Sequence, residues 1–253
     1  SFCNNFIMNK KKFILIIYDN AKTLTAALLI AILIRSLLFQ PFYIPSSSME
    51  PNLLVGDRIF VSKYTYGYSR HSFPFSPNIT NKRFFSKSPQ RGDLVVFKTP
   101  ADNRTDYIKR LIGMPGDAIQ FIDGELIIND KKIFREKIKN KKMIRCGNFM
   151  LDTNTFIETL PNGFEHIVVY KKRGSLQNSK IFKVPVDHYF LLGDNRDCSK
   201  DSRYLDSVGY VNSTNLVGKA QLIFFSNDTN ISSLLKFWNI DKSFRFERLF
   251  ELL

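Results

Sequence analysis

The chain has 253 residues, of which 44% are hydrophobic and 14% aromatic, so it is long enough for one anchor and a folded domain with a core. This composition excludes a disordered tail. Lys and Arg outnumber Asp and Glu by 37 to 23, for a formal net charge of +14. No helix-turn-helix, zinc-finger or ribonucleoprotein pattern accompanies that charge, so we expect a solvated or lipid-facing basic surface and no nucleic-acid partner.

The first predicted element is an apolar segment, residues 23–39. Its length, about 17 residues, is at the short end of the range that spans a bilayer, and Arg35 lies where its long side chain can reach the headgroup layer. No small-residue cleavage site of the A-x-A kind follows, which favours a retained anchor over a cleaved signal. A buried helix of a soluble domain is the alternative.

Basic residues set the expected orientation of this anchor. Lys10, Lys11, Lys12 and Lys22 precede it, whereas after Arg35 the next basic residue is Arg58. By the positive-inside rule, residues 1–22 stay cytoplasmic and residues 40–253 are exported.

The exported part is predicted to be mainly β, with a β-barrel or sandwich-like domain. Short runs rich in β-branched and aromatic residues alternate with turn signals. The predicted strands cover residues 58–62, 93–97, 107–112, a hairpin over 118–128 that turns at Asp123-Gly124, 167–170, 188–192 and 216–225.

Three stretches break this rhythm. Residues 66–90 are predicted to be a loop, and residues 131–183 a small, basic, β-rich insertion. The densest basic run, 131–145, is typical of an exposed hairpin or loop. Residues 231–253 place Trp, Phe and Leu beside Lys and Arg, which suits either an amphipathic membrane-interface segment or a core-packing helix.

Cysteine and histidine patterns indicate little chemistry. Cys3, Cys146 and Cys198 form no C-x-x-C pair, so neither a zinc site nor a disulfide framework is predicted, and a bridge between Cys146 and Cys198 stays open. The three histidines are scattered, and no H-E-x-x-H, G-x-S-x-G, P-loop or GxGxxG motif is present. We therefore expect no metal and no cofactor.

Two segments carry candidate chemistry, although each alone is usually structural. Residues 44–57, IPSSSMEPNLLVGD, place three serines directly after the anchor. Residues 106–117, DYIKRLIGMPGD, place Lys109 in an apolar strand, with Arg110 on the opposite face, so that one cation faces inward. Burial makes lysine usable as a base, because a pKa fall of roughly 2 to 3 units leaves a neutral fraction near pH 8.

A third segment, residues 193–211, is dense in Asp, Asn, Arg and Ser, which requires an internal hydrogen-bond network.

Four short motifs follow one another along the chain: PSSSMEPNL, RGDLVVFK, YIKRLIGMPGD and GDNRDCSKDSR. In sequence and in order they resemble the conserved motifs of bacterial type I signal peptidases. That resemblance implies a Ser/Lys endopeptidase of the bacterial inner membrane, with its catalytic domain on the periplasmic or outer face. Its partners would be the lipid bilayer and exported preproteins, cleaved after an Ala-x-Ala-like site.

The resemblance also implies roles for individual residues. Ser48 matches the nucleophile and Lys109 the general base, while Ser46 matches the hydroxyl that completes the oxyanion hole with the N–H of Ser48. Ser199 matches the serine that hydrogen-bonds and orients the lysine. Asp201 and Arg203 match a structural ion pair.

The substrate pockets implied by the resemblance are shallow and apolar. Their lining matches Phe42, Ile44, Met49, Leu53, Ile59, Val96, Tyr107 and Ile108. The sequence departs from the family at Ser47, where glycine is frequent, and at Cys198, where asparagine is frequent. A pilin or conjugation-system maturation peptidase and a non-catalytic membrane-tethered module are the remaining alternatives; a self-cleaving repressor-type peptidase would lack the anchor.

Overall fold

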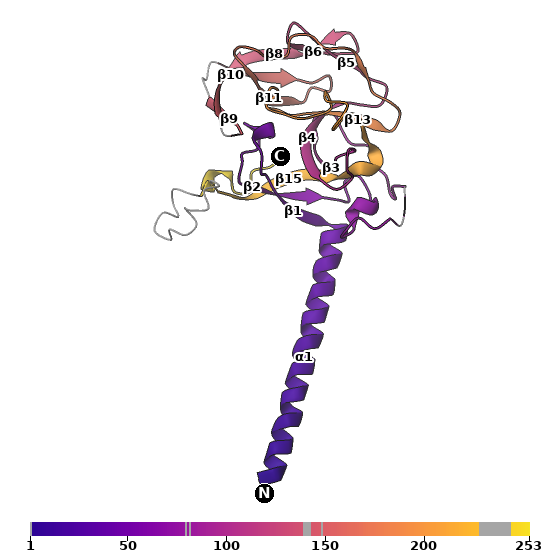
Figure 1. Cartoon of the computed structure of the whole chain (residues 1–253), viewed down its shortest axis with the longest axis vertical. Coiled ribbons are helices and arrows are strands. Elements are labelled where there is room, and N and C mark those ends of the chain that lie inside the picture. Colours follow the sequence, from indigo (N-terminus) through magenta and orange to yellow (C-terminus); the bar gives the residue numbers. More distant parts are fainter. Residues whose placement is uncertain (1, 79, 81, 139–142, 148, 228–243) are drawn as a thin grey trace.

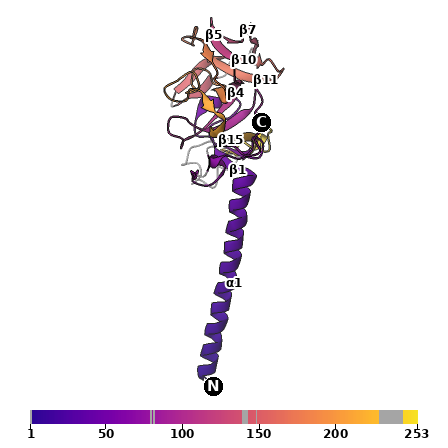
Figure 2. The same cartoon turned by 90° about the vertical axis from the view of Figure 1, so that its right-hand side faces the viewer.

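A long helix joins a β-rich domain in the computed structural model, which describes residues 2–78, 80, 82–138, 143–147, 149–227 and 244–253. Helix α1, Phe2–Leu37, projects from the domain as a stalk in both views (Figures 1 and 2). Within it, Leu15–Leu37 is the one described segment long and apolar enough to cross a membrane, and none of that window is buried. The predicted mainly β fold with one N-terminal apolar helix is confirmed.

Helix α1 ends earlier than the predicted segment 23–39. Leu37 is its last residue, and Phe39 already belongs to the first strand, where it pairs with Ser62. Pro41 lies in this strand at the edge of its sheet, a position that tolerates a residue without a backbone N–H. The last apolar residues of the predicted segment therefore belong to the β domain and not to the helix.

The main sheet of the described residues has seven antiparallel strands and contains every strand that borders the site. Their order is β1 (Phe39–Tyr43), β2 (Asp57–Ser62), β15 (Leu216–Ser226), β3 (Leu94–Lys98), β4 (Asp106–Gly113), β13 (His188–Leu192) and β14 (Val211–Asn212). The strands predicted over 58–62, 93–97, 107–112, 188–192 and 216–225 are confirmed in this sheet. The sheet is curled (Figure 1), and apolar side chains of β2, β3 and β15 belong to one buried cluster.

Two smaller antiparallel sheets cover the end of the domain away from α1 (Figure 1). One is formed by β11 (Glu165–Lys171), β10 (Phe149–Thr159) and β8 (Phe134–Ile138), with β9 (Met143–Cys146) also paired to β10. The other is formed by β12 (Phe182–Lys183), β5 (Ala118–Ile122), β6 (Glu125–Ile128) and β7 (Lys131–Lys132). The predicted hairpin at Asp123-Gly124 is confirmed as β5–β6.

The basic run 131–145 is not a hairpin in its described residues. Strands β8 and β9 both pair with β10 rather than with each other, because β10 is long enough to hold both at different positions along its length. The predicted β-rich insertion is thus largely one sheet built around β10, while β7 and β12, at its two ends, pair with β6 and β5, which lie outside it.

Short 3-10 helices connect the strands: η1 (Ser47–Met49), η2 (Arg70–Ser72), η3 (Ser213–Asn215) and η5 (Phe246–Arg248). The predicted loop, residues 66–90, contains η2 and one isolated bridge from Tyr68 to Phe84. Of the C-terminal segment, residues 231–243 lie outside the described residues. The described remainder, 244–253, forms no α-helix. It lies alongside β15, where Leu252 forms an isolated bridge with Leu222.

Candidate active site

The candidate nucleophile lies on η1, directly after β1. Met49 and Leu53 are fully buried, which anchors this short segment in the core beside β2 and β3. The Ser48 side chain is nearly buried, and its carbonyl accepts a hydrogen bond of 3.1 Å from the Asn195 backbone. Packing from one side and a hydrogen bond from the other therefore hold the serine in place.

The candidate base comes from β4, in the middle of the main sheet. Lys109 pairs in register with Val95 of β3, and its residue is only 4% exposed. Its Nζ lies 2.5 Å from Ser48 Oγ and 2.9 Å from the carbonyl oxygen of Ile108. The tertiary fold thus brings together two residues that lie 61 positions apart in the chain.

Burial changes the acid–base behaviour of Lys109. It lowers the pKa of the amine to about 8, against the opposing attraction of the Asp201 and Asp194 carboxylates. A pKa of about 8 leaves part of the amine neutral at neutral to mildly alkaline pH. Serine and amine can therefore exchange a proton across their short hydrogen bond without a histidine.

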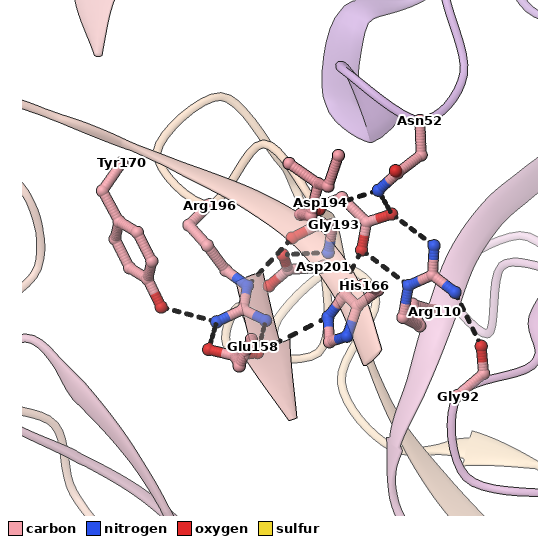
Figure 3. Close-up of polar contacts among 11 residues, drawn as sticks. Asn52, Gly92, Arg110, Glu158, His166, Tyr170, Gly193, Asp194, Arg196 and Asp201 are labelled. Carbon is pink, nitrogen blue, oxygen red and sulfur yellow. Dashed lines mark hydrogen bonds and ion pairs between the residues drawn. The ribbon is translucent and has the colours of Figure 1, made fainter. Parts of the chain in front are cut away.

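Arg110 does not face solvent, contrary to the expectation that only one cation of β4 faces inward. It is 4% exposed, and its guanidinium lies over the ring of Phe164, in the turn between β10 and β11. Arg110 donates to both carboxylate oxygens of Asp194, at 2.8 and 2.7 Å, and to the carbonyl of Gly92 (Figure 3).

Asp194 also reaches the segment that carries the nucleophile. It accepts a hydrogen bond of 2.6 Å from Asn52 Nδ2 (Figure 3). Through this carboxylate, the turn that follows β13 connects the strand of Lys109 with the residues just after Ser48. Arg110, Asn52 and Asp194 had no role in the sequence-based prediction; the polar density of 193–211 was the one signal that pointed to Asp194.

A second buried ion pair extends this network into the β10–β11 sheet. Arg196 donates to the carboxylate of Glu158 on β10 and to the hydroxyl of Tyr170 on β11 (Figure 3). His166 lies between the Glu158 and Asp194 carboxylates, at 3.5 and 3.8 Å. The predicted hydrogen-bond network of residues 193–211 is therefore present, but it includes partners from other sheets.

Asp201 and Arg203 form the expected ion pair. Arg203 Nε lies 2.8 Å from one Asp201 oxygen and its Nη2 lies 2.9 Å from the other. Asp201 also accepts a hydrogen bond of 3.0 Å from the Gly193 backbone. Because Asp201 is fully buried, this pair fixes the loop between Gly193 and Arg203 against the end of β13.

The Ser199 hydroxyl does not form the expected hydrogen bond to Lys109 in the described part of the chain. It lies instead against Gly193, where an added Cβ would come within 2.2 Å of Ser199 Oγ and 2.6 Å of the Ser48 carbonyl. Only glycine fits between these two segments. Ser199 is thus part of the tight packing behind the nucleophile, and its role in orienting the lysine stays a prediction.

The Ser46 hydroxyl lies 3.4 Å from Ser48 Oγ. Ser48 is in the first turn of η1, where backbone N–H groups have no partner within the helix. A hydroxyl and an N–H are therefore both close to the candidate nucleophile, as an oxyanion hole requires.

A cleft of about 570 Å³ opens onto Ser48 and Lys109. Six of the predicted pocket residues line it: Phe42, Ile44, Ile59, Val96, Tyr107 and Ile108. Met49 and Leu53 do not line this cleft, because their side chains point into the core behind its wall. Cys198 and Lys200, which had no predicted role in binding, form part of the lining.

A disulfide joins Cys146 of β9 to Cys198, with a Cα–Cα distance of 5.6 Å. The bridge that the sequence left open is therefore present. Asn195 Nδ2 donates to the carbonyls of Ser47 and Arg145, beside this bridge. The disulfide thus ties the β10 sheet to the loop that borders the cleft.

The described residues contain no group of three His, Cys, Asp or Glu side chains that could hold a metal ion.

Comparisons with known proteins place these features in context. Residues 17–225 match the family model described as signal peptidase, peptidase S26. A signal peptidase I of Rickettsia typhi is 41% identical and covers 92% of this chain and 96% of its own. One from Rickettsia conorii is 42% identical over 87% of both chains. A crystal structure of a signal peptidase I from Enterococcus faecalis is 26% identical, with a TM-score of 0.31 over 53% of this chain and 97% of its own.

Proposed function

Because this chain belongs to the signal peptidase, peptidase S26 family, we propose that it removes N-terminal signal peptides from exported preproteins with Ser48 as nucleophile and Lys109 as general base. The observation that carries this proposal is the 2.5 Å separation of Lys109 Nζ and Ser48 Oγ in a buried site. Serine is a weak nucleophile unless a neighbouring base takes its proton, and a buried neutral amine at this distance can do so.

The reaction follows from this pair. Lys109 takes the proton of Ser48 while Oγ attacks the scissile carbonyl, and the negative oxygen of the tetrahedral intermediate is stabilised by the Ser48 N–H and the Ser46 hydroxyl. The lysine ammonium then gives its proton to the leaving amine, and the mature protein departs. Water, deprotonated by the neutral lysine, hydrolyses the remaining ester and releases the signal peptide from Ser48.

Substrate preference would be set by the apolar side of the cleft. Phe42, Ile44, Ile59 and Ile108 surround space next to Ser48 that suits small side chains at the first and third positions before the cut. An Ala-x-Ala-like site fits this arrangement, because shallow apolar pockets discriminate mainly by excluding bulk.

Helix α1 supplies the proposed membrane anchor. Its segment Leu15–Leu37 is 23 residues long with a mean hydropathy of 1.5. Lys10, Lys11 and Lys12 precede it and favour a cytoplasmic N-terminus in the bacterial inner membrane, with residues 40–253 on the periplasmic or outer face. The cleft would then lie near the outer boundary of the membrane, where a preprotein presents its cleavage site.

A cleavage assay tests the proposed function. We expect the detergent-solubilised full chain to convert a preprotein with an Ala-x-Ala site into its mature form and a free signal peptide, with the new N-terminus read by mass spectrometry. A matched preprotein with bulky residues in place of both alanines should stay intact. An unchanged Ala-x-Ala precursor, under conditions where a known signal peptidase cuts it, would contradict the proposal.

A further inference from the structure

A second cavity, of about 350 Å³, lies where α1 meets the β domain. It is lined by side chains from the end of α1, from β1, from residues that follow β2 and from the connection between β3 and β4. The backbone N–H of Lys63 donates to the carbonyl of Leu38, and the Tyr68 hydroxyl donates to the carbonyl of Leu37. These bonds hold the residues after β2 directly against the end of the helix.

Positive charge dominates this junction cavity. Arg35, Lys63, Lys98 and Arg104 line it, against a single carboxylate, Asp106. That carboxylate is already paired with Lys98 at 2.9 Å. Three cations therefore share a small space without an anion of their own among the lining residues.

Lys63 is the cation for which this arrangement is most unfavourable. It is only 2% exposed, and Nζ has one hydrogen-bond partner in the described residues, the carbonyl of Ser72. No carboxylate of the described residues lies within ion-pair distance of it. Burial and the nearby charge of Arg35 lower the pKa of Lys63 to about 8, against the weaker attraction of the Asp106 carboxylate, so the amine is still mostly protonated at neutral pH. A buried cation of this kind is stabilised by an anion that binds beside it.

The surroundings indicate the source of that anion. Arg35 lies in the last turn of α1, at the end of the apolar segment Leu15–Leu37. Phe73 and Phe75 line the same cavity, and the Phe75 ring is fully exposed. An arginine at the end of a spanning segment reaches the headgroup layer, and exposed phenylalanine rings beside it suit the boundary between headgroups and acyl chains.

We propose that the junction cavity binds the phosphate of an anionic phospholipid, with Lys63, Arg35 and Arg104 as its cationic ligands. A zwitterionic lipid should bind more weakly, because its ammonium group would add to the positive charge already present. The site shares Phe42 and Asp106 with the cleft, so a bound headgroup would hold the cleft at a constant height above the membrane. This inference rests on the proposed membrane span of α1 but not on the peptidase activity.

Native mass spectrometry of the full chain in a non-ionic detergent tests the proposal. The probes are dihexanoyl phosphatidylglycerol, dihexanoyl phosphatidylcholine and inorganic phosphate, each titrated to obtain a Kd. We expect phosphatidylglycerol to bind at least about tenfold more tightly than phosphatidylcholine, the factor that about one charge-assisted hydrogen bond supplies. Use of the Ser48→Ala variant in parallel makes the result independent of any peptidase activity.

Two variants locate the site. Lys63→Met and Arg104→Gln should each weaken phosphatidylglycerol binding, Lys63→Met by about tenfold or more because it removes a buried charge-assisted contact. Arg104 is exposed, so its substitution leaves the fold intact even if Lys63→Met is poorly folded. Lys183→Met, which removes the same charge from an exposed lysine of β12, is the matched control and should bind as the wild type does.

Unchanged Kd values in both Lys63→Met and Arg104→Gln would overturn the proposal. Inorganic phosphate that binds in the cavity and is not displaced by phosphatidylglycerol would also overturn it, in favour of a free-anion site. Equal weakening in Lys183→Met would reduce the effect to overall charge and overturn it as well. Lost peptide cleavage with intact lipid binding would contradict only the proposed peptidase function.

Discussion

The carboxylate of Asp194 accepts two hydrogen bonds from Arg110, at 2.8 and 2.7 Å, and a third from Asn52, at 2.6 Å. Arg110 follows Lys109 on β4, and Asn52 lies four residues after Ser48. Asp194 is thus the shared partner of the two segments that carry the proposed base and nucleophile. We infer that it positions both without contacting the substrate.

Replacement of Asp194 by Asn should therefore destabilise the protein strongly. The change leaves the buried Arg110 guanidinium without its counter-ion, which typically costs about 3 to 5 kcal/mol. Asp152→Asn is the matched control, since Asp152 forms an exposed pair with Lys172 whose loss costs less than about 1 kcal/mol. Thermal unfolding of the full chain in detergent measures both, and an equal Tm for the two variants would contradict the positioning role.

Removal of either member of the proposed dyad should abolish cleavage. We expect Ser48→Ala and Lys109→Ala to lower kcat by at least about a thousandfold, because each removes a group that forms or transfers a bond. Ser47→Ala is the matched control: the Ser47 hydroxyl faces Cys198 Sγ at 3.9 Å, so its loss should leave kcat within about threefold. Circular dichroism checks the fold. Loss of activity in Ser47→Ala with normal activity in Ser48→Ala would show that Ser48 is not the nucleophile.

Cleavage should rise with pH through the pKa of Lys109. Only the neutral amine can take the serine proton, and burial lowers the pKa of this lysine to about 8. We expect kcat/KM for a peptide substrate to increase about tenfold per pH unit below pH 8 and to level off above it. A profile that is flat between about pH 6 and 9 would argue against lysine as the base.

Lys109 should also make the folded protein less stable at neutral pH. The unfolded chain keeps this lysine protonated up to about pH 10.4, whereas its pKa in the folded chain is about 8. Below about pH 8 the folded and the unfolded chain both hold the proton, so the free-energy cost of burying the cation is present in full. Between about pH 8 and 10.4 the unfolded chain binds more protons than the folded chain. The folded state therefore becomes more stable as the pH rises through this range, and the cost is lost.

Lys109→Met should consequently have a higher Tm than the wild type at pH 7, by an amount that corresponds to on the order of 3 kcal/mol. The difference should shrink as the pH approaches 10. Comparison of the two proteins at each pH cancels the other groups that titrate in this range. A Tm difference that stays constant with pH would show that the lysine is not buried as a cation.

Ser199→Ala should have a milder effect than Lys109→Ala. The Ser199 hydroxyl packs against Gly193 behind the nucleophile, and the predicted hydrogen bond to Lys109 would form only during the reaction. Loss of one such hydrogen bond should lower kcat by about fivefold to tenfold. If Ser199 orients the lysine during the reaction, kcat should fall while KM changes little. A wild-type kcat would contradict that role.

Much of the fold could be predicted because strands leave a local signal. The alternation of apolar and polar residues located the β5–β6 hairpin and most strands of the main sheet, and the polar density of 193–211 indicated a hydrogen-bond network. Residues 131–145 were less informative, since a run of lysines shows that a strand is exposed but does not show with which strand it pairs.

The sequence by itself determined the candidate chemistry: an apolar helix at the N-terminus, a serine directly after it and a lysine in an apolar strand. Only the tertiary structure decided that Ser48 and Lys109 meet, that Arg110 is buried as well, that Met49 and Leu53 face the core rather than the cleft, and that Arg35, Lys63 and Arg104 share one cavity. The physical reason is that a period of two assigns a side chain to one face of a strand, whereas what covers that face comes from residues far away in the chain.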